Sequence, residues 1–278
     1  MPVRLNFKKW IVGFGAIGSA MLFYPNDDDH NQSSQKQNSW ITPSSWSKWD
    51  HNWDRRHPEW LANVANLDND INKESRKKRS IRAKSNVKHI ILIRHGQYNT
   101  EGKADSDRTL TNLGKQQAEA TGKRLQELGL PYSLMVQSTI VRAKETAKII
   151  EKYLKDVTVT EDSVLSEGMP IAPDPPIDMW NTEVVVYEDG PRIEAAFRKY
   201  FHRPEPSQDK DSYIILVCHA NVIRYFVCRA LQFPPEGWLR LSLNHGSITW
   251  VSIRPNGRVT LRSLGDSGHM GPQLISSY

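Results

Sequence analysis

The chain has 278 residues, of which 38% are hydrophobic, and carries a formal net charge of +6. This length and apolar content allow one sizeable domain of about 190 residues plus an extension. Two cysteines give no support to a disulfide-stabilised secreted fold, and a zinc site has little support because neither His-Glu-x-x-His nor Cys-x-x-Cys occurs.

The first segment of interest is an uncharged run of 15 residues, 10–24, with Lys8 and Lys9 before it. It is shorter than the ~20 residues that usually cross a bilayer, although lysines that reach the headgroups can extend it. We expect a membrane anchor over residues 1–26. A cleaved signal peptide is the alternative. The Gly13-x-Gly15-x-x-Gly18 spacing in this run is not a dinucleotide fingerprint, since no strand precedes it.

Residues 27–86 are expected to form a linker that begins with a polar stretch, 27–39. Trp46, Trp49 and Trp53 follow at the spacing of one helical face. These aromatic side chains predict either packing onto the chain's own domain or an interface.

The basic character of the chain is local. The run 72–88 contains eight Lys or Arg and one Glu, so the rest of the chain is near neutral. Such a run is more often a solvated linker or a weak contact with anionic lipid than a nucleic-acid site. We therefore expect no nucleic-acid partner.

Residues 87–278 alternate strand and helix patterns, which predicts an α/β sandwich of three layers with a mostly parallel sheet. A hairpin is expected to close the sheet, because two strand-like runs flank Pro255-Asn256-Gly257. The expected strands are 87–93, 132–136, 157–161, 212–218, 247–253 and 258–264, and the expected helices are 111–128, 140–154, 191–201 and 221–231.

Two of the expected strands are followed by a histidine. Arg94-His95-Gly96 comes directly after the apolar run 89–93, and His219 comes after 213–218. In an open parallel sheet, ligands collect beyond the carboxyl ends of the strands. Either histidine alone would more often be structural, but two at one sheet edge predict a site.

Further polar residues follow other apolar stretches. Arg142 lies in the run Ser138–Ala143, and Glu167 follows the strand expected at 157–161. With Arg94, His95 and His219 they supply a nucleophile, two guanidinium groups, a second imidazole and a carboxylate. Planar guanidinium groups match phosphate oxygens bidentately, so the set favours phosphoryl transfer.

These motifs resemble the histidine phosphatase superfamily, in its phosphoglycerate mutase branch. The similar residues are Leu92–Gly96, Leu110–Ala118 and Ser138–Ala147, and the resemblance spans about 88–265. It implies that His95 attacks phosphorus and that Glu167 protonates the leaving oxygen. Arg94, Arg142 and His219 would surround the other phosphate oxygens, and the reaction needs no metal or other cofactor.

That chemistry requires a neutral His95, because an imidazolium has no lone pair for attack. Positive charge nearby disfavours a second positive charge, so we expect Arg94 and Arg142 to lower the pKa of His95.

A narrower resemblance, to a family of mitochondrial protein phosphatases, covers residues 49–54, 188–190, 193–197 and 218–241. It implies hydrolysis of phosphoserine and phosphothreonine on proteins, signalling kinases among them, with phosphohistidine as a further substrate. It also implies an uncleaved anchor in a mitochondrial membrane, with the outer membrane favoured and the inner membrane as the alternative. Homo-oligomerisation is associated with the motif formed by Trp49, Asp50, Asn52, Trp53 and Asp54.

Three functional classes remain open from sequence. The leading one is a protein phosphatase, the second is a small-molecule phosphatase or phosphoglycerate mutase that uses the same histidine, and the third is a mitochondrial scaffold with decayed catalysis. The third is weakened because all five pocket residues are present. The second differs from the first only in the surface around the pocket.

Overall fold

The computed structural model describes residues 49–56, 86–177, 182–205 and 208–277. All of them belong to one compact unit that spans 48–278. The expected membrane segment, 10–24, and the basic run up to residue 85 lie outside the described residues. Within the described ranges, no helix is long and apolar enough to cross a membrane.

The sheet has six strands in the order β3-β2-β4-β1-β5-β6. The pairs β3-β2, β2-β4 and β4-β1 are parallel, whereas β5 is antiparallel to both β1 and β6. The sheet is therefore mixed, and it ends in the expected hairpin. The strands are β1 (Lys88–Arg94), β2 (Tyr132–Gln137), β3 (Thr158–Glu161), β4 (Ser212–Cys218), β5 (Ile248–Ile253) and β6 (Val259–Asp266).

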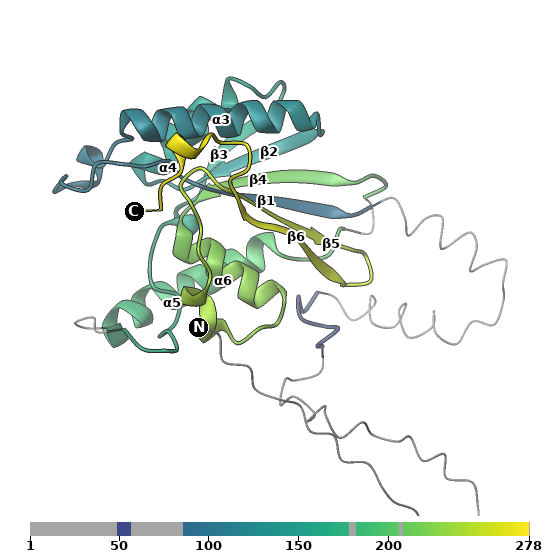
Figure 1. The fold of residues 1–278 in the computed structure, drawn as a ribbon. Coiled ribbons are helices and arrows are strands. Elements are labelled where there is room, and N and C mark those ends of the chain that lie inside the picture. Colours follow the sequence, from purple (N-terminus) through teal and green to yellow (C-terminus); the bar gives the residue numbers. More distant parts are fainter. Residues whose placement is uncertain (1–48, 57–85, 178–181, 206–207, 278) are drawn as a thin grey trace, which may run out of the picture. The chain divides into compact units, whose positions relative to one another are not determined.

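Helices cover both faces of this sheet, α3 and α4 on one and α5 and α6 on the other (Figure 1). This arrangement confirms the expected α/β sandwich. The α-helices are α3 (Asn112–Leu128), α4 (Val141–Glu151), α5 (Thr182–Tyr200) and α6 (Ala220–Ala230), and short 3₁₀ turns lie at Asp105–Asp107, Ser163–Leu165, Pro235–Arg240 and Pro272–Leu274.

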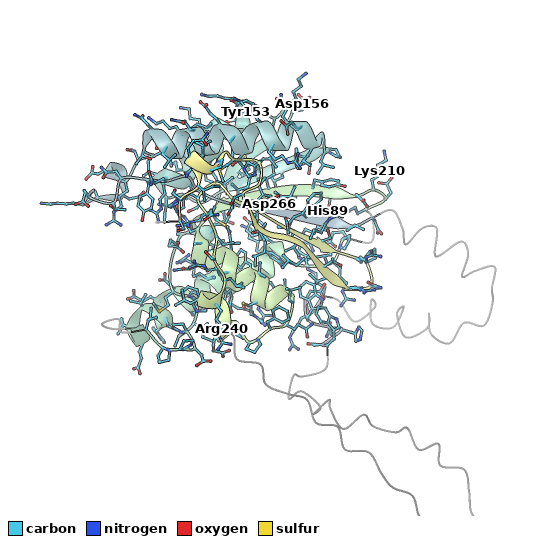
Figure 2. The ribbon with its side chains drawn as sticks, in the orientation of Figure 1. His89, Tyr153, Asp156, Lys210, Arg240 and Asp266 are labelled. Carbon is cyan, nitrogen blue, oxygen red and sulfur yellow. The ribbon has the colours of Figure 1, made fainter. Side chains whose placement is uncertain are left out.

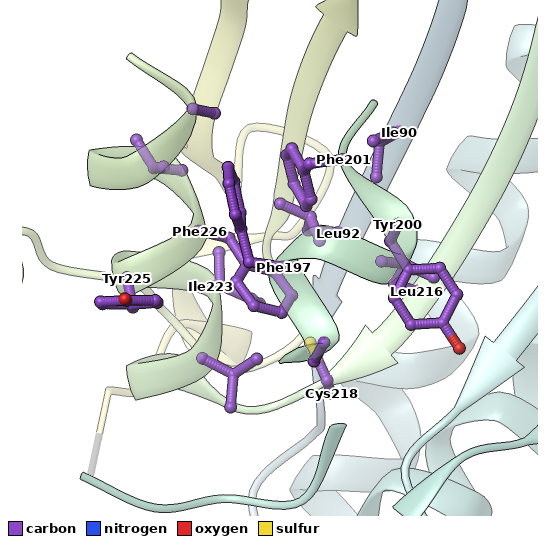
Figure 3. Close-up of a cluster of buried hydrophobic side chains, with 14 of the residues drawn as sticks. Ile90, Leu92, Phe197, Tyr200, Phe201, Leu216, Cys218, Ile223, Tyr225 and Phe226 are labelled. Carbon is purple, nitrogen blue, oxygen red and sulfur yellow. The ribbon is translucent and has the colours of Figure 1, made fainter. Parts of the chain in front are cut away.

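β1 is one of the two central strands, and all seven of its residues are buried. Successive side chains of a strand point to opposite faces. Ile90 and Leu92 accordingly pack in the cluster under α5 and α6, while Ile91 and Ile93 pack in the cluster under α3 and α4. Figure 3 shows the first cluster, in which the ring of Phe201 lies 5.0 Å from that of Phe197 and 5.2 Å from that of Phe226.

Helix α5 begins nine residues earlier than expected, at Thr182 instead of residue 191, and runs through Pro191. Proline lacks an amide hydrogen, so Gly190-Pro191 is a typical signal for a helix boundary. Tertiary packing outweighs that signal here. A β-carbon on Gly190 would lie 2.8 Å from the carbonyl oxygen of Pro170, so this part of the helix lies directly against the 168–171 loop.

The segment 49–56, assigned to the linker from sequence, packs onto the catalytic domain. Residues 51–54 form a turn, so the expected helical face of tryptophans is wrong for this segment. Trp53 is buried and donates its indole N–H to the carbonyl of Gly257 at 2.8 Å, and Asp54 forms an ion pair with Arg203 at 3.0 Å.

Lys88, the last residue of the basic run, is not part of a solvated linker. It is the first residue of β1 and is buried. His89 and Lys210, labelled in Figure 2, mark the amino-terminal ends of β1 and β4. Arg94, His95 and His219, expected to belong to the site, lie at the opposite ends of these strands.

Candidate active site

The two strand-end histidines meet because β1 and β4 are parallel neighbours that end together. Their register pairs Arg94 with Cys218, and the backbone N–H of His95 donates to the carbonyl of Cys218 at 3.0 Å. The imidazole rings of His95 and His219 have centroids 5.1 Å apart. Both side chains are buried.

The glycine that follows His95 permits a close approach of β1 to the start of α3. A β-carbon on Gly96 would lie 2.4 Å from the carbonyl oxygen of Gly114, and one on Gly114 would lie 1.9 Å from that of Gln97. Both distances are too short for a side chain. Thr111 caps the helix beside them by accepting a hydrogen bond from the Gly114 N–H at 3.0 Å.

Hydrogen bonds define which nitrogen of His95 is available for attack. Its Nδ1 lies 2.8 Å from the carbonyl oxygen of Gly96, which can only accept, so Nδ1 carries the hydrogen. Nε2 then has the lone pair and accepts a hydrogen bond from Nε–H of Arg142 at 3.1 Å. A phosphate that drew Arg142 onto its own oxygens would free Nε2 to attack phosphorus.

The protein holds the pKa of His95 well below its usual value. Burial is the largest cause, and the interaction with His219 and the charges of Arg142 and Arg94 act in the same direction. The expected direction is confirmed, but removal from water contributes more than the arginines. His95 is therefore neutral at physiological pH.

Arg94 is buried, with a guanidinium group held by several acceptors. Nη1 donates to the carbonyls of Leu243 and Ser277, and Nη2 donates to Nε2 of His245 at 3.0 Å. Nε is buried and has no hydrogen-bond partner among the described residues. Burial lowers the pKa of Arg94 to about 10, so the group stays charged at neutral pH.

Arg142, in the first turn of α4, adds the second guanidinium group. It lies over the ring of Tyr98, 4.5 Å from the ring centroid, and Asp105 is 3.8 Å from its Nη1. A cation over an aromatic face is attracted by the ring electrons, so Tyr98 helps to fix this side chain. Arg142 is itself buried.

His219 is the second imidazole of the site. Its Nε2 lies 2.9 Å from the hydroxyl of Ser138, while Nδ1 is buried without a hydrogen-bond partner in the described part of the chain. Burial and the nearby arginines lower the pKa of His219 well below its usual value. An unsatisfied buried nitrogen at this position suits a ligand that supplies a hydrogen-bonding group.

Glu167 lies in the loop after the Ser163–Leu165 turn and is partly buried. Burial raises its pKa to about 6, although Arg142 and Arg94 lower it in part. The loop is fixed by Arg192 of α5, whose guanidinium donates to the carbonyls of Ser166 at 2.6 Å and Glu167 at 3.1 Å. A carboxyl group with a pKa near neutrality can donate a proton and take one back.

The structure thus brings together the residues expected from sequence: Arg94, His95, Arg142, Glu167 and His219. Glu167 is linked to the rest of this set by charge, since Arg142 and Arg94 both lower its pKa. Within the described ranges, no group of three or more His, Cys, Asp or Glu side chains could hold a metal ion.

Sequence reasoning missed residues that support this set. Ser138 contacts His219, and His245 contacts Arg94. Arg192 donates a hydrogen bond to the backbone carbonyl of Glu167. Ser138 is the first residue of the run Ser138–Ala143, which carries Arg142, so the sequence offered a signal that it belongs to the site. His245 follows no strand pattern of its own and is 151 residues from Arg94, so only the fold reveals it.

The model of the histidine phosphatase superfamily (branch 1) matches residues 90–169 and 187–266. "Serine/threonine-protein phosphatase PGAM5, mitochondrial" of Xenopus laevis is 48% identical over 273 residues, which cover 98% of this chain and 99% of that protein. The Homo sapiens protein of the same name is 55% identical over 231 residues, 82% of this chain and 80% of that protein. The crystal structure of a phosphoglycerate mutase from Plasmodium falciparum is 37% identical, with a TM-score of 0.47, and covers 65% of this chain and 91% of that one.

The two strand-end histidines, their arginines and this extent of identity agree: the chain belongs to branch 1 of the histidine phosphatase superfamily, and within it to the family of the mitochondrial serine/threonine-protein phosphatases PGAM5.

Proposed function

We propose that this chain is a mitochondrial protein phosphatase that hydrolyses phosphoserine and phosphothreonine through a phosphohistidine at His95. The observation that carries the proposal is the neutral, buried imidazole of His95, with its Nε2 lone pair directed to Arg142. The names and identities of the relatives support protein substrates and mitochondria.

The first chemical step transfers the phosphoryl group to the enzyme. Arg94, Arg142 and His219 bind the non-bridging oxygens, and Nε2 of His95 forms a bond to phosphorus. The bond from phosphorus to the serine or threonine oxygen breaks, and Glu167 gives its proton to that oxygen. Much of the stabilisation comes from charge that is already in place, because Arg94 is held by three acceptors before substrate arrives. Arg142 turns from Nε2 of His95 onto the phosphate oxygens.

The second step releases phosphate. A water molecule attacks the phosphorus of phosphohistidine, Glu167, now ionised, takes its proton, and the bond from phosphorus to Nε2 breaks. His95 and protonated Glu167 are regenerated. Division of the hydrolysis into two displacements lowers the barrier of each.

The proposal extends to the remaining features of the chain. Phosphohistidine on proteins is a further substrate class, and signalling kinases are among the protein substrates. Residues 10–24 anchor the protein in a mitochondrial membrane, with the outer membrane favoured. Assembly into homo-oligomers involves Trp49, Asp50, Asn52, Trp53 and Asp54. The narrower sequence resemblance supports these four statements.

The test compares the full chain with its His95→Ala variant on phosphoserine peptides, phosphothreonine peptides and 3-phosphoglycerate, with released phosphate as the readout. We expect peptide turnover in the wild type and none in the variant. Turnover of 3-phosphoglycerate alone would favour a small-molecule phosphatase or mutase instead. No turnover by folded wild type would favour the scaffold.

A further inference from the structure

The guanidinium group of Arg94 is hydrogen-bonded to groups of the protein that take no part in the proposed reaction. Three acceptors bind this one guanidinium group: the carbonyls of Leu243 and Ser277 at Nη1 and the imidazole of His245 at Nη2. The two backbone carbonyls would be present whichever residues stood at positions 243 and 277. The third acceptor depends on the side chain at position 245, which is a histidine.

His245 uses both ring nitrogens in this arrangement. Nε2 accepts from the Arg94 guanidinium at 3.0 Å, so Nδ1 carries the hydrogen and donates to the hydroxyl of Ser276 at 3.0 Å. The backbone N–H of His245 also donates to the carbonyl of Ser276 at 2.8 Å. The side chain is only 1% exposed.

The imidazole remains an acceptor over the physiological range. Burial and the charge of Arg94 lower the pKa of His245 to about 3, so it stays neutral. A protonated ring would place a second cation against Arg94 and would lose the lone pair that accepts the hydrogen bond. The hydrogen bond from Arg94 to His245 therefore persists at any pH at which the enzyme is expected to work.

The segment 274–277, which contains Ser276 and Ser277, is itself held by a buried residue of α3. The side-chain amide of Gln117 donates to the carbonyl of Leu274 at 2.7 Å and to the hydroxyl of Ser276 at 2.9 Å. Its carbonyl oxygen accepts from the backbone N–H of Gln97 at 2.8 Å, two residues after His95. One hydrogen-bonded network thus connects the nucleophile loop, the segment 274–277, His245 and Arg94.

The pattern of occupied donors defines what Arg94 offers to substrate. Nη1 has two acceptors and Nη2 has one, whereas Nε–H has none among the described residues. A buried guanidinium N–H without an acceptor is a donor that remains available to a ligand. Phosphate oxygens are strong acceptors for such a group.

We infer that His245 is a positioning residue for the phosphate-binding Arg94, which it holds, through its own bond to Ser276, with Nε–H free for substrate. The inference deepens the proposed function and rests on it in taking phosphate as the ligand. His245 is not a catalytic residue in this scheme. Its ring lies 5.6 Å from that of His95, but both of its nitrogens are already engaged within the protein.

The test is a pair of substitutions in the full chain, His245→Gln and His245→Met. The Gln amide oxygen can occupy the position of Nε2 and accept from Arg94, whereas Met fills a similar volume without a strong acceptor. Loss of a hydrogen bond to a charged group should weaken binding of inorganic phosphate about tenfold in His245→Met. His245→Gln should stay within about threefold of wild type. Calorimetric titration with inorganic phosphate measures both, and the Tm of each variant checks folding.

The matched control is His269→Met. His269 is a partly buried histidine whose Nε2 contacts Thr121 at 3.1 Å and which has no contact with Arg94. Its phosphate affinity should equal that of wild type. Unchanged phosphate affinity in His245→Met would overturn the inference, and so would equal losses in the Gln and Met variants at unchanged Tm.

The phosphate titration separates this inference from the proposed function. Wild type that binds phosphate but hydrolyses no phosphopeptide would refute the proposed function, while the comparison of the two His245 variants would still decide the positioning role. Wild type that hydrolyses phosphopeptides while His245→Met binds phosphate normally would refute the positioning role alone.

Discussion

At the scale of single residues, Glu167 has the property that a switch between acid and base requires. Its pKa is raised to about 6 by burial, while the hydrogen bond from the backbone N–H of Gly168 and the charges of Arg142 and Arg94 keep it from rising further. A group with that pKa is protonated in part at neutral pH. Both steps of the proposed reaction can then use the same carboxyl group.

We predict that Glu167→Gln slows hydrolysis of phosphoserine peptides by about 10²- to 10⁴-fold, because a serine leaving oxygen needs a proton. Hydrolysis of p-nitrophenyl phosphate should fall much less, since nitrophenolate leaves without one. Rates on both substrates in parallel measure the difference. Glu127→Gln, in the last turn of α3 with a side chain that is 67% exposed, is the control. Equal losses on the two substrates would contradict the role of Glu167 as an acid.

The pH dependence follows from the same pKa. Glu167 donates only while protonated, so kcat/KM for phosphoserine peptides should fall as pH rises above about 6. His95 should not limit the rate between pH 6 and 8, because its lowered pKa keeps it neutral there. A pH profile of wild type beside Glu167→Gln checks this. A decline above pH 6 that persists in the variant would belong to another group.

The residues of the site differ in how far sequence could predict them. Arg94, His95 and His219 are identified because each closes or follows an apolar run of strand length, and such runs fix a position in a sheet. His245 and Arg192 act through partners that are 151 and 25 residues away. No local pattern encodes those distances, so their roles require the folded chain.

At the scale of elements, strands were easier to predict than helix ends. The central strands are continuous apolar runs, because both faces of the sheet are covered, and their bounds lie within a residue or two of expectation. The start of α5 was missed because Gly190-Pro191 resembles a boundary. What extends the helix, its contact with the 168–171 loop, lies outside any local window.

Helix α5 has a functional consequence, because its Arg192 holds the loop that bears Glu167. That side chain bonds the carbonyls of Ser166 and Glu167 and pairs with Asp189 at 2.5 Å. We predict that Arg192→Met lowers kcat on phosphoserine peptides about tenfold or more through misplacement of Glu167. The affinity for inorganic phosphate should change little, since Arg94 and Arg142 remain.

The control for Arg192 lies on the same helix. Arg198 pairs with Glu194 at 3.0 Å, and its side chain is largely exposed. Arg198→Met should therefore leave kcat unchanged. If Arg192→Met weakened phosphate binding as strongly as it lowered kcat, the loop would have a wider role than the placement of Glu167.

At the scale of the whole molecule, the tryptophan motif shows one of the two kinds of packing expected for it. Sequence shows that Trp49 and Trp53 need a partner surface but not which surface. In the structure, Trp53 packs on the chain's own domain and Asp54 accepts hydrogen bonds from Arg203. Packing on the same chain and assembly with other copies are both compatible with one motif, because a docked segment shapes the surface around it.

The buried ion pair gives the last prediction. Asp54 is 0% and Arg203 4% exposed at the side chain, so Asp54→Ala leaves a buried guanidinium group without its counter-ion. We expect a loss of about 3 kcal/mol in the free energy of unfolding. Urea denaturation measures it. The exposed pair of Arg56 and Glu205 is the control, and Glu205→Ala should cost less than about 1 kcal/mol.

The double variant Asp54→Ala with Arg203→Met then separates two explanations of that loss. Removal of both charges should restore much of the stability if the cost arises from the unpaired guanidinium group. If it does not, docking of the segment depends on the hydrogen bond from the backbone N–H of Arg203 to Asp54, which the double variant also lacks. The mass of the oligomer, measured on the same variants, shows whether assembly requires the docked segment 49–56. A stable double variant that still assembles would show that the motif assembles without this ion pair. A stable variant that stays monomeric would make docking of the segment a precondition for assembly.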